Sequence, residues 1–129
     1  MRPFAIVFML IVVLFACQTN TEQTSANKND SVIEKLSAVD FKAAIQSDES
    51  DKIILDVRTP SEFNSGAIPN SINIDYRNEN FGTSIESLDK SSTVYVYCQG
   101  GVRSSKAAEL MEAKGFKKII ELEKGFSSY

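Results

Sequence analysis

The sequence predicts an α/β protein with one domain, in which a mostly parallel central sheet carries helices on both faces. Short runs of β-branched and aromatic residues alternate along the chain with segments whose apolar residues recur at helical spacing. Such alternation is typical of a parallel sheet whose strands are joined by crossover helices. The chain has 129 residues, which leaves room for one domain of about 100 residues with its own core. No segment repeats at a fixed period, so a solenoid is not expected.

The domain is predicted to begin at residue 32 with a short strand followed by a helix. Residues 32–36 have the composition of an edge strand, with two charged residues among three apolar ones. Ser37-Ala38-Val39-Asp40 has the Ser-x-x-Asp spacing that opens a helix. The apolar residues at 41, 44 and 45 then supply one face that can pack against the sheet.

The middle of the domain is predicted to contain two strands separated by a short helix. Residues 52–56 form an apolar run that predicts a buried strand. Thr59-Pro60-Ser61-Glu62 has the residues of a capping box with proline at the first helical position. Residues 71–74 predict another strand. Residues 76–89 are polar and are expected to be irregular, with one helical turn near Ile85.

The last part of the domain is predicted to be a strand, a helix and a strand. Residues 93–97 are β-branched and aromatic and predict a buried strand. Residues 103–114 carry apolar side chains at helical spacing, and Gly115 ends that helix. Residues 118–122 predict the final strand. The loop after the strand at 93–97 begins with Cys98, at the end of the sheet where ligands of parallel sheets bind.

The loop that contains Cys98 is suited to holding a sulfur anion. Gly100 and Gly101 have no side chain that would keep backbone N–H groups from converging on one point. The start of the following helix adds the positive end of its dipole at the same place. A thiol surrounded by such donors ionises more readily, because the donors stabilise the thiolate. The alternative is that Cys98 is buried, inert and a small hydrophobic residue.

Composition excludes several classes of site. The chain contains no histidine, so an imidazole base and a histidine-ligated metal site are both impossible. Two cysteines are too few for a cysteine-based zinc cluster. We therefore expect no metal and no cofactor. The net charge of −3 gives no support to nucleic-acid binding.

Residues 1–16 are predicted to be a secretory signal peptide. They carry one positive charge, at Arg2, and then thirteen residues without charge from Phe4 to Ala16. That run is shorter than the about 17–25 residues needed to span a bilayer as a helix. The alternative is an uncleaved or buried N-terminal helix.

The residues that follow predict a lipid anchor and a tether. Leu14-Phe15-Ala16-Cys17 resembles a bacterial lipoprotein box, which implies lipidation of Cys17 after cleavage. Residues 17–31 are mostly polar and are predicted to be a flexible tether. We expect an exported protein on the periplasmic side or the cell surface, attached to the membrane by lipid. Cys98 would then be the only free thiol.

Three sequence blocks, in order, resemble those of the rhodanese (sulfurtransferase) domain family. The first is Leu55-Asp56-Val57-Arg58-Thr59-Pro60-Ser61-Glu62-Phe63 together with Gly66-Ala67-Ile68-Pro69-Asn70-Ser71-Ile72-Asn73-Ile74. The second is Cys98-Gln99-Gly100-Gly101-Val102-Arg103-Ser104, and the third is Leu122-Glu123-Lys124-Gly125-Phe126-Ser127-Ser128-Tyr129. The resemblance spans residues 32–129 and implies a single rhodanese-like domain.

The resemblance implies a sulfurtransferase in which Cys98 is the nucleophile. Its thiolate would take sulfur from a small anionic donor such as thiosulfate, become a persulfide, and pass the sulfur to cyanide, a thiol or a protein acceptor. Arg58 would help to steer the anionic donor, although pairing with Asp56 or Glu62 is the alternative. The residues expected to bind the substrate through the loop are Gln99, Gly100, Gly101, Val102, Arg103 and Ser104.

Two other functions remain open at this point. A rhodanese-like fold can serve as a binding or sulfur-sensing module without turnover. A cysteine phosphatase is disfavoured, because four residues separate Cys98 from Arg103 whereas cysteine phosphatases have five. Arg103 itself has two interpretations, since it can contact the substrate or pair with a carboxylate behind the loop.

Overall fold

The computed structural model describes residues 31–129 of the chain. The predicted signal peptide, the predicted lipidation site Cys17 and all but the last residue of the predicted tether lie outside the described residues. In the part that is described, no helix has both the length and the apolar character needed to cross a membrane.

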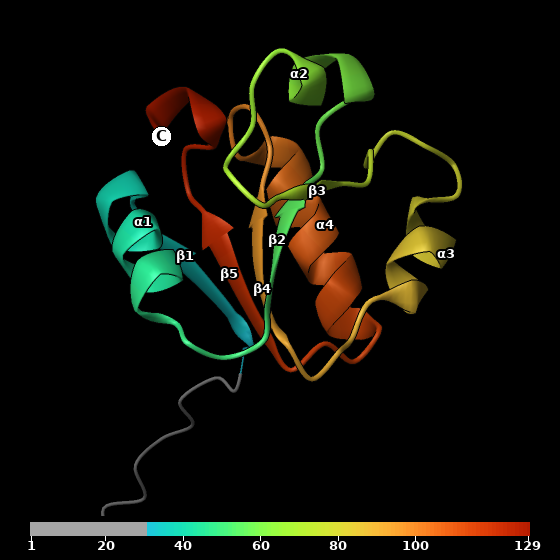
Figure 1. The fold of residues 1–129 in the computed structure, drawn as a ribbon. Helices are drawn as coiled ribbons and strands as arrows, with labels where there is room; N and C mark the ends of the chain where they lie inside the picture. Colours follow the sequence, from blue (N-terminus) through green and yellow to red (C-terminus); the bar gives the residue numbers. More distant parts are fainter. Residues whose placement is uncertain (1–30) are drawn as a thin grey trace, which may run out of the picture.

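Five parallel strands form one sheet, and every pairing within it is parallel. The strand order is β1-β5-β4-β2-β3, so the last two strands of the chain lie between β1 and β2 (Figure 1). The strands are β1 (Ile33–Leu36), β2 (Lys52–Asp56), β3 (Ile72–Asn73), β4 (Thr93–Tyr97) and β5 (Lys118–Leu122). All five strands that the sequence predicts are present, and β1 and β3 are shorter than predicted.

Helices cover both faces of this sheet, as expected for parallel strands joined by crossovers (Figure 1). On one face lie α1 (Ala38–Ser47) and the C-terminal 3-10 turn η2 (Phe126–Ser128). On the other lie α3 (Phe81–Ser84), the 3-10 turn η1 (Ile85–Ser87) and α4 (Val102–Ala113). The short helix α2 (Pro60–Asn64) sits above the carboxyl ends of the strands. The segment from 76 to 89 is more helical than predicted.

Two helix starts form as the sequence predicts. The Ser37 hydroxyl accepts a hydrogen bond from the N–H of Asp40, which caps α1. At α2, Thr59 and Glu62 form the reciprocal capping box, and Pro60 occupies the first helical position. These local bonds fix the direction in which each helix leaves its strand.

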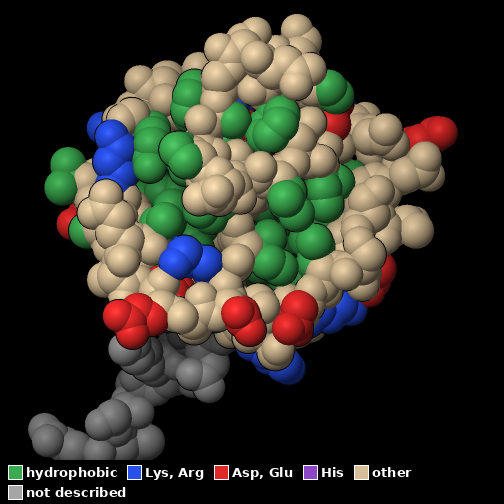
Figure 2. All heavy atoms as spheres, in the orientation of Figure 1, with side chains coloured by type: hydrophobic (Ala, Val, Ile, Leu, Met, Phe, Trp, Pro, Cys, Tyr) green, Lys and Arg blue, Asp and Glu red, His purple; other side chains and the backbone are tan. Residues whose placement is uncertain are grey.

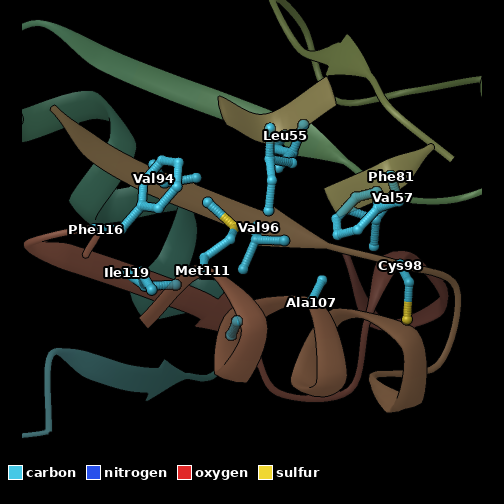
Figure 3. Packing of buried hydrophobic residues seen from close by; sticks show 12 residues of the cluster. Leu55, Val57, Phe81, Val94, Val96, Cys98, Ala107, Met111, Phe116 and Ile119 are labelled. Atoms are coloured by element: carbon cyan, nitrogen blue, oxygen red, sulfur yellow. The ribbon is translucent and has the colours of Figure 1, made fainter. Parts of the chain in front are cut away.

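The central strand β4 is buried along its whole length and divides the core in two. On the α4 side, Val94 and Val96 pack with Met111 and Ala107, and Cys98 ends the same cluster (Figure 3). On the α1 side, Tyr95 meets Phe41 edge to face at 5.5 Å between ring centroids. Burial on both faces explains why this strand is apolar at every position.

The C-terminal turn holds the Cys98 loop by direct backbone contacts. The N–H of Phe126 donates to the Cys98 carbonyl at 2.7 Å, and the N–H of Ser127 donates to the Gln99 carbonyl at 3.1 Å. Gly125 permits this approach, because a Cβ there would lie 2.5 Å from the Gln99 carbonyl carbon. The two glycines of the loop itself differ. Only Gly101 has a positive φ, of 94°, and its Cβ would lie 2.3 Å from the Glu123 carbonyl oxygen.

The neighbouring glycines of the loop therefore form a matched pair for substitution. Gly101→Ala should lower the free energy of unfolding by more than about 2 kcal/mol, because backbone strain adds to a backbone clash. Gly100→Ala should change it by less than about 0.5 kcal/mol, since nothing lies within 4 Å of a Cβ at that position. Urea unfolding of both variants measures the difference. Equal losses of free energy of unfolding in the two variants would contradict the claim that only position 101 requires glycine.

Candidate functional site

The site lies where the connections from the two central strands diverge. β4 and β2 are neighbours in the sheet, and the chain leaves β4 toward β5 but leaves β2 toward β3. Loops that diverge in this way open a crevice at the carboxyl ends of the strands. Cys98 follows β4 and Arg58 follows β2, so the topology brings both residues to this crevice.

The Cys98 sulfur faces inward, into the start of α4. Its side chain is almost fully buried, with 1% of the residue exposed. The N–H of Gly101 donates to Sγ at 3.1 Å, and the Ser104 hydroxyl oxygen lies 3.5 Å from Sγ. Cys98 thus sits among donors from the loop and from the first turn of the helix.

These contacts change the acidity of the thiol. Burial by itself would raise the pKa of Cys98. The Ser104 hydroxyl and the N–H groups of Ser104, Gly100 and Gly101 outweigh burial, so the pKa of the thiol lies below its ordinary value. A lowered pKa increases the fraction of thiolate at neutral pH, which is the reactive form.

Ser104 connects the sulfur to a buried acid that sequence reasoning missed. Glu121 lies on β5 and is 1% exposed, and its Oε1 accepts a hydrogen bond from the Ser104 hydroxyl at 2.9 Å. Its only sequence signal is a single charged residue within the apolar run Ile119-Ile120-Glu121-Leu122. That pattern does not reveal which neighbour the carboxylate contacts.

Arg58 is held in a buried ion pair rather than projecting freely. Its Nη2 donates to Asp56 Oδ2 at 2.7 Å and to the Gly66 carbonyl at 2.6 Å. Its Nε donates to the same carboxylate, and Nη1 donates to the Gln99 side chain at 3.1 Å. The Phe126 ring lies 4.2 Å from the guanidinium carbon. These bonds use four of the five guanidinium N–H groups, one on Nε, two on Nη2 and one on Nη1.

Arg103 is also paired, with the acid that closes the capping box of α2. Its two terminal nitrogens donate to the two oxygens of Glu62 at 2.8 and 2.9 Å. The Arg103 bonds are the largest cause of a pKa for Glu62 that lies well below its ordinary value, and the Thr59 bonds add to the effect, whereas burial opposes it. The pair ties α2 to α4 and fixes one wall beside the Cys98 loop.

An open hollow of about 310 Å³ lies beside the loop. Arg58, Gln99 and Phe126 line it, together with Ser61, Glu62, Ser65 and Gly66. A hollow of about 410 Å³ lies elsewhere, between α1 and the sheet, and its lysines Lys42 and Lys52 donate to backbone carbonyls. On the face drawn in Figure 2, several acidic side chains lie along the lower edge, and others lie at the sides and near the top.

The predicted site residues come together, with different roles. Gly101 and Ser104 contact the sulfur, and Gln99 reaches Arg58. Val102 is 68% exposed, so its side chain points to solvent. Phe126 belongs to a sequence block quoted above, but its position over Arg58 was not predicted. Within residues 31–129, no group of three acidic or cysteine residues could hold a metal ion.

The Glu62–Arg103 pair predicts a pH-dependent contribution to stability. Because the folded-state pKa of Glu62 is lowered, its contribution is present above the unfolded pKa of about 4.3 and is lost as the pH falls below it. At pH 7 we expect Glu62→Gln to reduce the free energy of unfolding by about 1–2 kcal/mol. Urea unfolding should show that the difference in free energy of unfolding between the unsubstituted protein and Glu62→Gln becomes smaller from pH 7 to pH 3. A difference that is as large at pH 3 as at pH 7 would contradict the ion-pair explanation.

Two curated proteins share part of this sequence. A tRNA uridine(34) hydroxylase from Pelagibacter ubique is 35% identical over 82 residues, which are 63% of this chain and 27% of that protein. A Bacillus subtilis protein named "Putative sulfur carrier protein YrkF" is 33% identical over 104 residues, 81% of this chain and 55% of that protein. The chain thus spans only 27% and 55% of the lengths of these two relatives.

The solved structures and the family match lead to one assignment. The crystal structure of a rhodanese-related protein from Thermoplasma volcanium has a TM-score of 0.64 and 30% identity, and covers 74% of this chain and 88% of that one. The sequence model described as "Rhodanese-like domain" matches residues 37–129. With the parallel sheet and the Cys98 loop as described, the chain belongs to the rhodanese-like domain family.

Proposed function

We propose that this chain is a sulfurtransferase that carries sulfane sulfur on Cys98. The observation that carries the proposal is the Cys98 sulfur, which receives the Gly101 N–H at 3.1 Å and has a lowered pKa. A loop built in this way stabilises a sulfur anion, whether it belongs to a thiolate or to a persulfide. Likeness to a protein named as a sulfur carrier also supports it.

The proposed reaction has two displacement steps. The Cys98 thiolate attacks the outer sulfur of thiosulfate, a new S–S bond forms, and sulfite leaves with the electron pair of the broken bond. Cyanide or a thiolate then attacks the outer sulfur of the persulfide, and Cys98 leaves as the thiolate. The terminal persulfide anion would receive the same N–H donors that stabilise the thiolate.

Arg58 is proposed to attract the donor from its fixed position. The residue lines the hollow beside the loop, and one guanidinium N–H remains beyond the four that hold Asp56, Gly66 and Gln99. Arg103 has a structural role in this proposal, because Glu62 binds both of its terminal nitrogens. We do not extend the hydroxylation named for the Pelagibacter relative to this chain, because the matched region covers only 27% of that protein's length.

Mass spectrometry of the protein after treatment with thiosulfate tests the reaction. We expect Cys98 to gain one sulfur atom, and we expect cyanide to remove it with release of thiocyanate. Cys98→Ser should gain no sulfur within residues 31–129, where it leaves no cysteine.

Two outcomes would replace the proposal. An unmodified Cys98, in a protein that binds a specific partner through the same face, would favour the binding or sulfur-sensing module. Hydrolysis of an aryl phosphate that depends on Cys98 would favour a phosphatase. The matched control is Ser47→Ala, an exposed serine of α1 that does not line the hollow, which should leave sulfur transfer unchanged.

We further propose that the protein is exported and anchored through lipid on Cys17. Support comes from the apolar run before Cys17 and the polar residues after it. In bacterial cells that express the full chain, Cys17→Ser should move it from the membrane fraction to the soluble fraction. A variant that stays in the membrane fraction would show that Cys17 is not the anchor.

A further inference from the structure

The buried acid Glu121 has no part in the reaction as described above. It is 1% exposed, and within residues 31–129 its Oε2 accepts no hydrogen bond. The ammonium of Lys35, on the edge strand β1, approaches Oε2 to 3.4 Å while donating to the Ser105 hydroxyl at 3.0 Å. A buried carboxylate is costly unless it is paired and bonded, so an incompletely bonded one beside a reactive thiol calls for a physical explanation.

The hydrogen bonds of Ser104 connect this carboxylate to the Cys98 sulfur. Its hydroxyl oxygen lies 2.9 Å from Glu121 Oε1, 3.2 Å from the Gly101 carbonyl oxygen and 3.5 Å from Cys98 Sγ. A carboxylate, a carbonyl and a thiolate are all acceptors, and a serine hydroxyl has one proton to donate. The nearest of the three is charged, and charge-assisted hydrogen bonds are the stronger ones.

We propose that Glu121 is a positioning residue that competes with Cys98 for the proton of Ser104. While the Ser104 hydroxyl donates mainly to the carboxylate, it stabilises the Cys98 thiolate less than it would without Glu121. Without that competition, the hydroxyl would turn to donate fully to the thiolate. Glu121 thereby restrains the ionisation of Cys98, and Lys35 weakens the restraint by drawing carboxylate charge toward Oε2.

The other charged groups near the sulfur are already paired. On α4, Arg103 is bound by Glu62 of α2, and after β2 Arg58 is bound by Asp56. On β4, the residue in register with Glu121 is the apolar Val96. Among residues 31–129, the charged group within ion-pair distance of Glu121 is Lys35, at 3.4 Å. Glu121→Gln tests the competition directly, because an amide can donate to Ser104 and leave the hydroxyl proton for the sulfur.

The measurement is the rate of alkylation of Cys98 by iodoacetamide across a pH series. Glu121→Gln should lower the midpoint by about 0.5–1 pH unit, which is a three- to ten-fold faster reaction well below the midpoint. Ser104→Ala should raise the midpoint, and in that background Glu121→Gln should have no further effect. Lys35→Met should raise the midpoint, and it serves as the second variant because Lys35 is half-exposed. Glu123→Gln, which removes an exposed acid near the end of the same strand, should leave the midpoint unchanged.

The double variant separates competition for a proton from other effects. An unchanged or raised midpoint in Glu121→Gln would overturn the proposal, as would an equal shift with and without Ser104. The inference refines the proposed function by naming what controls its nucleophile. Alkylation requires no sulfur donor, so the two can fail separately. If Glu121→Gln shifts the alkylation midpoint but thiosulfate leaves no persulfide on Cys98, only the proposed sulfurtransferase function is wrong. If Cys98 forms the persulfide but the midpoint does not shift, only the proposed role of Glu121 is wrong.

Discussion

The backbone contact between the Cys98 loop and the C-terminal turn determines how the site is built. The carbonyl oxygen and the N–H of one peptide plane point in opposite directions. When Phe126 and Ser127 hold the carbonyls of Cys98 and Gln99 outward, the N–H groups of Gln99 and Gly100 must turn the other way. The loop is thus oriented by bonds on its far side, and the anion-stabilising face follows from the planarity of the peptide.

The two arginines show how a small domain holds such a loop in place. Arg58 joins the end of β2 to Gln99, and Arg103 joins α4 to α2, so each bridges segments about 41 residues apart in sequence. An arginine suits this role because its planar group can bond several oxygens at once. The consequence is that most of the positive charge near the thiol is balanced within the protein. Apart from one guanidinium N–H of Arg58, an anion at this loop would meet mainly backbone N–H groups.

Local sequence patterns predicted most of the fold, because its elements are set by local chemistry. The apolar runs, Ser37 and the capping box from Thr59 to Glu62 each act within a few residues, and the structure has them where expected. The order of the strands was not predicted beyond its parallel character, since it depends on which faces pack together.

The site was only partly predictable for the same reason. Cys98 and its glycines form one short block, but Glu121 reaches Ser104 only after the chain has passed through α4 and returned along β5. The partners of Arg58 and Arg103 were open alternatives in the sequence, and the structure gives Asp56 and Glu62. Gly100 and Gly101 are indistinguishable as letters, yet only Gly101 meets a carbonyl across the loop.

The two edge strands of the sheet affect how readily the protein aggregates at high concentration. β3 pairs through only two residues, which gives an incoming chain little to add to. β1 places the exposed Glu34 and Lys35 side by side on the opposite border. Short edges and charged edges both discourage intermolecular strand pairing, the usual route to β-aggregates. Copies of this domain at high concentration should therefore resist pairing through their edge strands.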